Sequence, residues 1–266
     1  MFIADYHTHS DFSSDSSTPL EENIKKAVDL GLREIAVTDH IDFDYPDPDF
    51  PFVFDYAPYR AEIERLKEKY SRKIKIKTGV EVGVQPHVLK EIDELMKNHY
   101  DFVIASSHVV DKCDLCTNDF FEGKTKFMAY LGYFADVLNN VKTCDFFSVY
   151  GHIDFINRYG NYADKKMVYG DYKFITDEIL KTIIEKGKGI EINTSGYRYG
   201  LGHTHPQFEL VKRYKELGGE IITVGSDAHV PEDIAKDFDK AYKMLEEAGF
   251  KYLTLFTDKK PEFVKI

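Results

Sequence analysis

Six of the ten histidines in this 266-residue chain lie at or just past the end of a short apolar run, where a β-strand would end. His7 and His9, like Asp227 and His229, are two residues apart, a spacing that projects both side chains from one face of an extended strand. The other histidines so placed are His40, His108 and His152. Imidazole and carboxylate ligands without a thiolate suit zinc, iron or manganese better than magnesium or calcium. The pattern therefore indicates metal binding.

These side chains need a fold that brings several strand ends together. Apolar or β-branched runs alternate with longer segments of helical periodicity, which is typical of βα units around a parallel sheet. Seven strands are predicted near residues 2–6, 34–38, 75–81, 102–107, 147–151, 189–193 and 220–225. The connections from strand to helix are long near 41–56, 108–123, 151–170 and 194–205. The elaborated face is thus the carboxyl end of the strands, where a βα barrel builds its active site.

Carboxylates accompany the histidines at these strand ends. Glu81 ends the third predicted strand and Asp227 follows the seventh, so a barrel would gather acids and imidazoles at one mouth. Asp15 lies in a serine-rich loop, where an aspartate is ordinarily a turn residue. Six histidines and these three acids exceed the usual ligand number of one ion, and a carboxylate such as Glu81 can bridge two. We therefore expect more than one metal ion.

Local signals also predict particular elements. Thr18-Pro19-Leu20-Glu21 has the pattern of an N-cap, a first-turn proline and a capping-box glutamate. An eighth apolar stretch, residues 252–256, follows the seventh unit. The clearest helical stripe consists of Tyr59, Ile63, Leu66 and Tyr70.

Length and composition limit the class of protein. With 43% hydrophobic and 14% aromatic residues, the chain is expected to form a single domain over residues 1–266. No apolar run approaches the roughly 18 residues of a membrane span, and the opening residues do not resemble a signal peptide, so a cytoplasmic protein without membrane contact is expected. Three cysteines argue against a disulfide framework. A net charge of −11 disfavours nucleic-acid binding and requires any phosphate site to carry its own positive charge.

Six short motifs contain these histidines and acids. They are Asp5-Tyr6-His7-Thr8-His9-Ser10, Thr38-Asp39-His40, Gly79-Val80-Glu81, Ser107-His108, Gly151-His152-Ile153-Asp154 and Ser226-Asp227-Ala228-His229. In this order, and over essentially the whole chain, they resemble the polymerase and histidinol phosphatase (PHP) superfamily. Segments 42–55, 158–160 and 191–198 narrow the resemblance to its Gram-positive-type histidinol-phosphatases.

The resemblance implies a fold and a metal cluster. The fold would be an α/β, distorted seven-stranded (β/α)7 barrel similar to a TIM barrel, with residues 252–256 outside it. The cluster would hold three divalent ions, which in this family are zinc, iron or manganese. The implied ligands are His7, His9, Glu81 and Asp227 for the first ion, Glu81, His108 and His152 for the second, and Asp15, His40 and His229 for the third.

The resemblance also implies an activity. Histidinol-phosphatases hydrolyse L-histidinol phosphate to L-histidinol and phosphate in histidine biosynthesis. The expected mechanism is attack by metal-activated hydroxide. Glu81, Asp227 and His229 are expected to be catalytic. Protonation of the leaving alkoxide stays open between Asp227, a histidine and metal coordination. A covalent phosphoenzyme is disfavoured because no serine or cysteine nucleophile motif stands at a strand end.

Three further residues are candidates to contact the substrate. Arg158 and Arg198 lie in long loops on the active face, and a guanidinium can bind phosphate through two hydrogen bonds; the alternative is a surface charge. His205 is expected to contact the phosphate or the leaving group. The aspartates of segment 42–55 could attract the substrate's ammonium group. Cys113 and Cys116 have a spacing seen in zinc sites, but no second pair accompanies them.

Two other functions fit part of the pattern. Another PHP phosphoesterase, acting on nucleotides or on a different small phosphate monoester, would share the metal motifs. The acidic net charge and the lack of a basic groove in the sequence argue against nucleic-acid substrates. A non-catalytic ligand-binding barrel would be expected to have lost ligands, whereas every ligand position is filled here.

Overall fold

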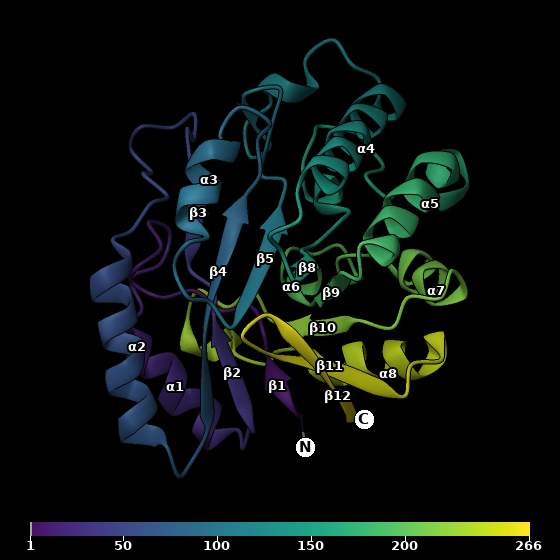
Figure 1. Cartoon of the computed structure of the whole chain (residues 1–266). Coiled ribbons are helices and arrows are strands. Elements are labelled where there is room, and N and C mark those ends of the chain that lie inside the picture. The colour runs from purple at the N-terminus through teal and green to yellow at the C-terminus, as the bar shows by residue number, and fades with distance from the viewer. Residues whose placement is uncertain (1) are drawn as a thin grey trace.

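Seven parallel strands follow one another around a nearly closed barrel in a computed structural model that describes residues 2–266 (Figure 1). The strand order is β1-β2-β4-β5-β8-β9-β10, and each neighbouring pair is parallel. The strands are β1 (Ala4–Asp5), β2 (Glu34–Val37), β4 (Lys75–Gly83), β5 (Phe102–Ser106), β8 (Val149–Tyr150), β9 (Gly189–Asn193) and β10 (Ile222–Gly225). The predicted seven-stranded α/β barrel is confirmed.

The barrel closes between its first and last strands. The backbone N–H of Tyr6 donates to the carbonyl of Val224 at 3.0 Å, and that of His9 donates to the carbonyl of Ala228 at 2.8 Å. The second bond lies beyond the strand ends and joins the segment that carries His9 to the one that carries Asp227. The contacts that bridge the first and last strands therefore also bring His9 close to Asp227.

Helices cover the outside of the barrel. The stripe predicted in α2 is buried against the sheet at all four of its positions. The helices are α1 (Leu20–Asp29), α2 (Tyr56–Tyr70), α3 (Leu89–Leu95), α4 (Lys126–Thr143), α5 (Tyr169–Glu185), α6 (Ser195–Arg198), α7 (Phe208–Glu216) and α8 (Phe238–Ala248), with 3-10 turns η1 (Asp119–Phe121), η2 (Phe155–Arg158) and η3 (Pro231–Asp233). Within residues 2–266, no helix combines the length and the apolar character needed to cross a membrane.

The start of α1 differs from the predicted capping box. Pro19 occupies the N-cap position, and no side chain caps the helix. The Thr18 hydroxyl instead donates to the carbonyl of His229 at 2.9 Å, and Glu21 pairs with Arg65 of α2 at 2.9 Å. The residues that the local pattern assigns to a helix cap therefore tie α1 to the loop after β10 and to its neighbouring helix.

Two short elements lie in the long connections at the carboxyl end of the barrel. Strand β3 (His40–Asp42) pairs in parallel with the last residues of β4 and places His40 opposite Glu81. Strands β6 (Val109–Val110) and β7 (Cys113–Asp114) form an antiparallel hairpin directly after His108. Both elements add walls to the mouth of the barrel.

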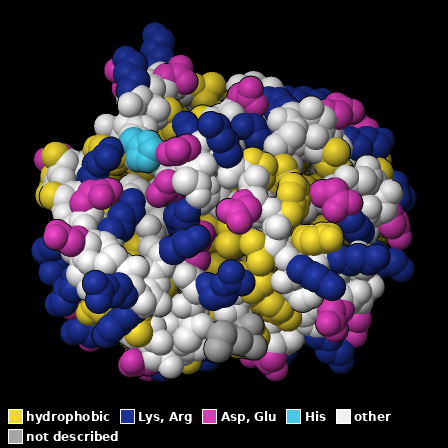
Figure 2. Space-filling model, turned by 60° about the horizontal axis from the view of Figure 1, so that its bottom comes forward, with side chains coloured by type: hydrophobic (Ala, Val, Ile, Leu, Met, Phe, Trp, Pro, Cys, Tyr) yellow, Lys and Arg dark blue, Asp and Glu magenta, His cyan; other side chains and the backbone are white. Residues whose placement is uncertain are grey.

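The last two strands lie outside the barrel, as expected for residues 252–256. Strands β11 (Tyr252–Thr257) and β12 (Lys260–Lys265) form an antiparallel hairpin at the amino end of the barrel (Figure 1). The N–H of Ile222, the first residue of β10, donates to the Thr254 hydroxyl at 3.1 Å, and the N–H of Phe256 donates to the Tyr6 hydroxyl at 2.8 Å. On the lower face, Figure 2 shows Lys and Arg dispersed among acidic and apolar side chains.

A polar network attaches α4 to the barrel wall beside the site. The carboxylate of Asp136 accepts hydrogen bonds from the Ser107 hydroxyl at 3.3 Å and from the Asn140 amide at 2.9 Å. The Ser107 hydroxyl also lies 2.7 Å from that of Tyr150 on β8. Burial raises the pKa of Asp136 to about 6, although both hydrogen bonds lower it. This network holds the residue that precedes His108.

Replacing Asp136 with asparagine should stabilise the protein at pH 8 and have little effect at pH 4. The pKa of Asp136 is about 6 in the folded state and 3.8 in a model peptide, so between these values the folded state binds more protons and wild-type stability falls as pH rises. The difference corresponds to at most about 3 kcal/mol. Urea unfolding at both pH values, at equal metal content, measures it. The exposed Asp93→Asn is the control, and an equal effect of D136N at both pH values would contradict the assignment.

Candidate active site

Glu81 is a fully buried carboxylate at the carboxyl end of β4, and imidazoles surround it. Its Oε2 lies 3.0 Å from Nε2 of His7 and 3.2 Å from Nδ1 of His40, and its Oε1 lies 2.9 Å from Nε2 of His152. Its other imidazole neighbours are His9 at 3.4 Å and His108 at 3.3 Å. The ends of four different strands therefore converge on one carboxylate.

The structure brings all nine predicted metal ligands into one cluster. Asp15 Oδ2 lies 3.0 Å from Nε2 of His229 and 3.7 Å from Nε2 of His40, at the outer edge of the cluster. Four overlapping sets have donor atoms within 4.8 Å of one another: His7, His9 and Asp227; His7, Glu81 and His152; His40, Glu81 and His108; and His9, His40 and His229. This arrangement has donors for several ions.

The electrostatics of the cluster suit metal binding. Burial alone would raise the pKa of Glu81, but the imidazoles of His7, His40 and His108 hold it well below its usual value. Burial, with help from His229 and His40, lowers the pKa of His9 to about 3. Burial also lowers the pKa of His7, His40 and His108, but the adjoining carboxylates outweigh it and raise the pKa of each imidazole. Metals coordinate ionised carboxylates and neutral imidazoles, so metal binding here would release protons from these histidines.

Unpaired atoms give an independent test of the fit. Nε2 of His9 and Nδ1 of His40 are buried and make no well-aligned hydrogen bond among residues 2–266, although Glu81 Oε2 lies 3.4 and 3.2 Å from them. The ring of His9 stacks between those of His40 and His229, with centroids 4.3 and 4.2 Å away. Such imidazoles would be costly to bury without a partner. Because the donors are nitrogen and oxygen only, the residues fit zinc, iron or manganese.

Polar groups outside the cluster orient its imidazoles. Glu191 Oε1 on β9 lies 2.6 Å from Nδ1 of His7, and Asp42 Oδ1 lies 2.8 Å from Nδ1 of His108. A carboxylate on one ring nitrogen directs the other toward a metal. Sequence reasoning missed this role of Glu191 and gave Asp42 a different one, because both depend on contacts between distant strands.

Glycine makes room for Glu191. A Cβ at Gly225 would lie 2.3 Å from Cβ of His7 and 2.4 Å from Oε1 of Glu191, and one at Gly151 would lie 2.7 Å from the Ser106 hydroxyl. Either methyl group would displace these side chains. The glycines at the ends of the fifth and seventh predicted strands are therefore the sequence signal for a crowded polar interior.

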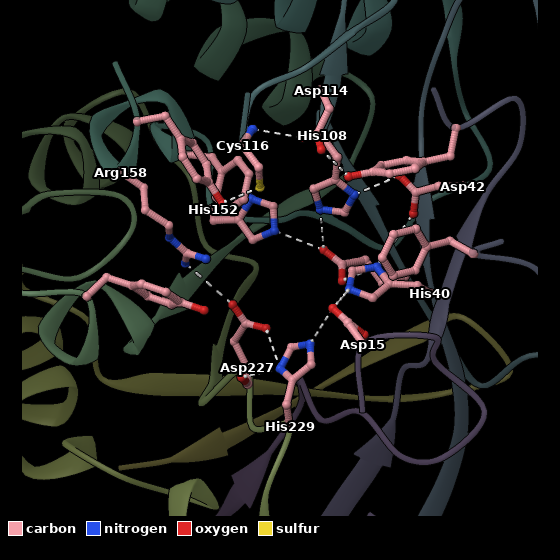
Figure 3. Close-up of a pocket in the computed structure, with 16 residues that line it drawn as sticks. Asp15, His40, Asp42, His108, Asp114, Cys116, His152, Arg158, Asp227 and His229 are labelled. Carbon is pink, nitrogen blue, oxygen red and sulfur yellow. Dashed lines mark hydrogen bonds and ion pairs between the residues drawn. The ribbon is translucent and has the colours of Figure 1, made fainter. Parts of the chain in front are cut away.

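The cluster opens on a cavity of about 320 Å³ that Arg158 also lines (Figure 3). The Arg158 guanidinium points toward Asp227, with Nη2 3.6 Å from Oδ2, and lies between the rings of Phe155 and Tyr199, 4.5 and 3.8 Å from their centroids. Its Nη2 also donates to the Ser195 hydroxyl at 2.6 Å. The structure thus places the Arg158 guanidinium beside the cluster of metal donors.

Arg198 and His205 are not among the residues that line this cavity. Arg198 donates to the carbonyl of Asp227 at 2.7 Å and pairs with Asp233 at 3.3 Å. Asp227 has a left-handed backbone, with φ of 56°, so Arg198 braces the turn that carries a predicted ligand. His205 is fully buried, and its Nδ1 lies 2.7 Å from Oδ1 of Asp154. Both side chains therefore support loops beside the site, and their contact with the substrate stays a prediction.

The outer part of the cavity comes from segment 43–55 and the β6–β7 hairpin. The Tyr45 hydroxyl donates to Asp114 Oδ2 at 2.6 Å, and Cys116 Sγ lies 3.2 Å from the Tyr159 hydroxyl. Cys113 and Cys116 are free thiols and belong to none of the donor sets among the described residues. Sequence reasoning missed Tyr45 and Asp114 as cavity residues, and no local signal marks them.

Comparisons with known proteins agree with this site. The model of the PHP domain family matches residues 5–195. A histidinol-phosphatase of Lactococcus lactis is 35% identical over 96% of this chain and 95% of the relative, and a probable histidinol-phosphatase of Clostridium acetobutylicum is 32% identical over 94% and 95%.

Solved structures give the same result. The crystal structure of the L. lactis histidinol phosphate phosphatase, complexed with zinc, L-histidinol and phosphate, matches with a TM-score of 0.92 and 32% identity, over 98% of this chain and 100% of that one. A putative histidinol phosphatase of Listeria monocytogenes shares the fold, with a TM-score of 0.75 and 21% identity, over 89% and 99%. The chain therefore belongs to the PHP domain family and, within it, to the histidinol-phosphatases.

Proposed function

We propose that this chain, acting as a single domain over residues 1–266, hydrolyses L-histidinol phosphate to L-histidinol and phosphate in histidine biosynthesis. The observation that carries the proposal is one cavity lined by both a cluster of metal donors and a buried guanidinium. The support from relatives is the L. lactis protein, which was crystallised with both products of this reaction.

We assign three divalent ions, zinc or in its place iron or manganese, to the cluster. The ligand sets that we assign are His7, His9, Glu81 and Asp227, then Glu81, His108 and His152, then Asp15, His40 and His229. They divide the cluster differently from the four distance-based donor sets, which also place His40 with Glu81 and His9 with His229. Divalent ions bound there lower the pKa of a coordinated water and neutralise charge on the phosphoryl oxygens. Glu81 is placed to serve two sets, because its two oxygens face different histidines.

Arg158 is the residue that we assign to the phosphoryl group. Stacking between Phe155 and Tyr199 restricts the rotation of its guanidinium, and its Nε is buried without a protein partner among the described residues. A guanidinium held in this way can donate to phosphoryl oxygens without further ordering. Phe155 and Tyr199 thus position the cation as well as lining the cavity.

Asp227 is the group that we assign to proton transfer, and His229 supports it. Asp227 Oδ1 lies 3.7 Å from Nδ1 of His229, and the His229 side chain is 26% exposed. Asp227 Oδ1 can therefore accept the proton of the attacking water. His229 positions this residue, because its Nδ1 lies 3.0 Å from the Asp227 carbonyl while its Nε2 faces Asp15. The Arg198 bond to the carbonyl of Asp227 holds this carboxylate in place.

The purified protein should hydrolyse L-histidinol phosphate with a kcat/KM at least about tenfold above that for nucleoside 5′-monophosphates. A hydrogen bond to a charged group on the alcohol half of the substrate typically raises kcat/KM by about this factor. Chelation should abolish turnover, and zinc or manganese should restore it. Phosphate release across a panel of esters measures the preference. A higher kcat/KM on a nucleotide would favour a different phosphoesterase activity.

Glu81→Gln should lose at least one equivalent of metal and reduce activity by more than about 100-fold. Among residues 2–266, Glu81 is the carboxylate that lies within 3.4 Å of His7 and His9 as well as of His108 and His152. Loss of a residue that only supports a ligand typically costs about 10 to 100-fold. Elemental analysis and circular dichroism of the purified variant measure metal and fold. Glu34→Gln, which changes a buried glutamate of β2 that binds the Tyr6 hydroxyl, is the matched control. Full metal content in Glu81→Gln would show that the ligand assignment is wrong.

Arg158→Ala should keep its metal and raise the KM for the substrate by about 10 to 100-fold, because a charge-assisted bond to the phosphate is lost. Arg158→Lys should recover only part of this, since an ammonium lacks the planar fork. Arg198→Ala should instead lower kcat through the Asp227 turn. Steady-state kinetics with inorganic phosphate as inhibitor separates these effects. Unchanged KM and phosphate inhibition in Arg158→Ala would make Arg158 a structural residue.

A further inference from the structure

Asp114 differs from every other carboxylate that lines the cavity. Asp15, Asp42, Glu81 and Asp227 each lie within 3.8 Å of an imidazole or guanidinium nitrogen. The side chain of Asp114 has two hydrogen-bond partners, both uncharged, and no cation pairs with it among residues 2–266. The cavity therefore contains one carboxylate whose charge the protein leaves uncompensated.

The protein nevertheless orients this carboxylate. The Tyr45 hydroxyl donates to Oδ2 at 2.6 Å, and the backbone N–H of Cys116 donates to Oδ1 at 2.7 Å. Tyr45 comes from segment 43–55 and Asp114 from the β6–β7 hairpin, so two separate loops meet at this bond. Each carboxylate oxygen keeps a lone pair for a third partner.

The surroundings of Asp114 are suited to the organic half of a substrate. In Figure 3 it lies across the cavity from Asp227 and His229. Tyr45 packs edge-on against Phe52, with centroids 4.7 Å apart, and both rings line the cavity. A half-buried carboxylate beside aromatic rings attracts a cation more strongly than one in open water.

We propose that Asp114 binds the ammonium group of the substrate's alcohol half, so that the cavity selects phosphate monoesters of amino alcohols. This inference rests on the proposed phosphatase function and assigns the specificity of the same site. The metal cluster and Arg158 hold the phosphoryl end, and Asp114 holds the positive charge at the other end. Asp42 and Asp44 of segment 42–55 each already have an imidazole partner, His108 and His87 respectively, which Asp114 lacks.

The test compares two substrates that differ only in the amino group. L-Histidinol phosphate carries it, and 3-(imidazol-4-yl)propyl phosphate lacks it. Asp114→Asn should lower kcat/KM for histidinol phosphate by about 10 to 100-fold, mainly through KM, and should leave the analogue within about twofold. Inhibition by L-histidinol should weaken in parallel, while metal content stays unchanged.

Two further variants keep the test sharp. Asp111→Asn removes the same charge from an exposed position of the same hairpin, outside the cavity, and should change neither substrate. Tyr45→Phe leaves the charge of Asp114 but removes the hydroxyl that orients it, and should cause a smaller loss on histidinol phosphate alone. A loss in Asp114→Asn confined to the substrate with the amino group supports the proposal.

Equal effects on both substrates, or none, would overturn it. Should Asp114→Asn fail to fold, equal effects of Tyr45→Phe on both substrates would do the same. The wild-type protein separates the two levels of inference. If the wild-type protein hydrolyses histidinol phosphate but Asp114→Asn affects both substrates equally, only the assignment of Asp114 is overturned. If the wild-type protein does not hydrolyse histidinol phosphate, the proposed function is overturned as well.

Discussion

A carboxylate buried at the end of a barrel strand is the constraint on which this structure depends. Placing Glu81 in the protein interior would be costly without compensating groups, because a charge loses its hydration there. Five imidazoles supply that compensation, and they come from four strand ends. The register of those strands is therefore an electrostatic requirement as much as a packing one. The pairing of His40 with Glu81 between β3 and β4 shows it directly.

The next layer of residues fixes the imidazoles in turn. Glu191 and Asp42 each hold a ring nitrogen, and Gly225 leaves the space that Glu191 occupies. Arg198 holds the turn of Asp227 through its carbonyl. Each of these contacts links elements far apart in the chain, so the site is rigid only when the whole barrel is formed.

The sequence predicts the barrel and the cluster of metal donors better than it predicts the loop contacts around them. Strand-end histidines point to the mouth because their positions along the chain encode the topology of a βα barrel. Contacts between distant loops leave no such trace. Thr18 has a perfect local cap pattern, yet a bond to His229 prevails, and the direction of the Arg198 side chain follows from the turn at Asp227. Asp114 lies in a loop whose importance appears only when Tyr45 approaches it.

Two loops meet at the hydrogen bond between Tyr45 and Asp114. The residues that determine substrate specificity therefore lie on different segments from the residues of the metal cluster. Residues of segment 43–55 and of the β6–β7 hairpin can be substituted without moving the end of a barrel strand, since neither loop belongs to the barrel sheet. A lineage of such barrels can therefore diversify its choice of alcohol while its metal chemistry stays unaltered. In evolutionary terms, the hairpin after His108 is a replaceable module, and substitutions there would give phosphatases of new specificity around an unchanged reaction centre.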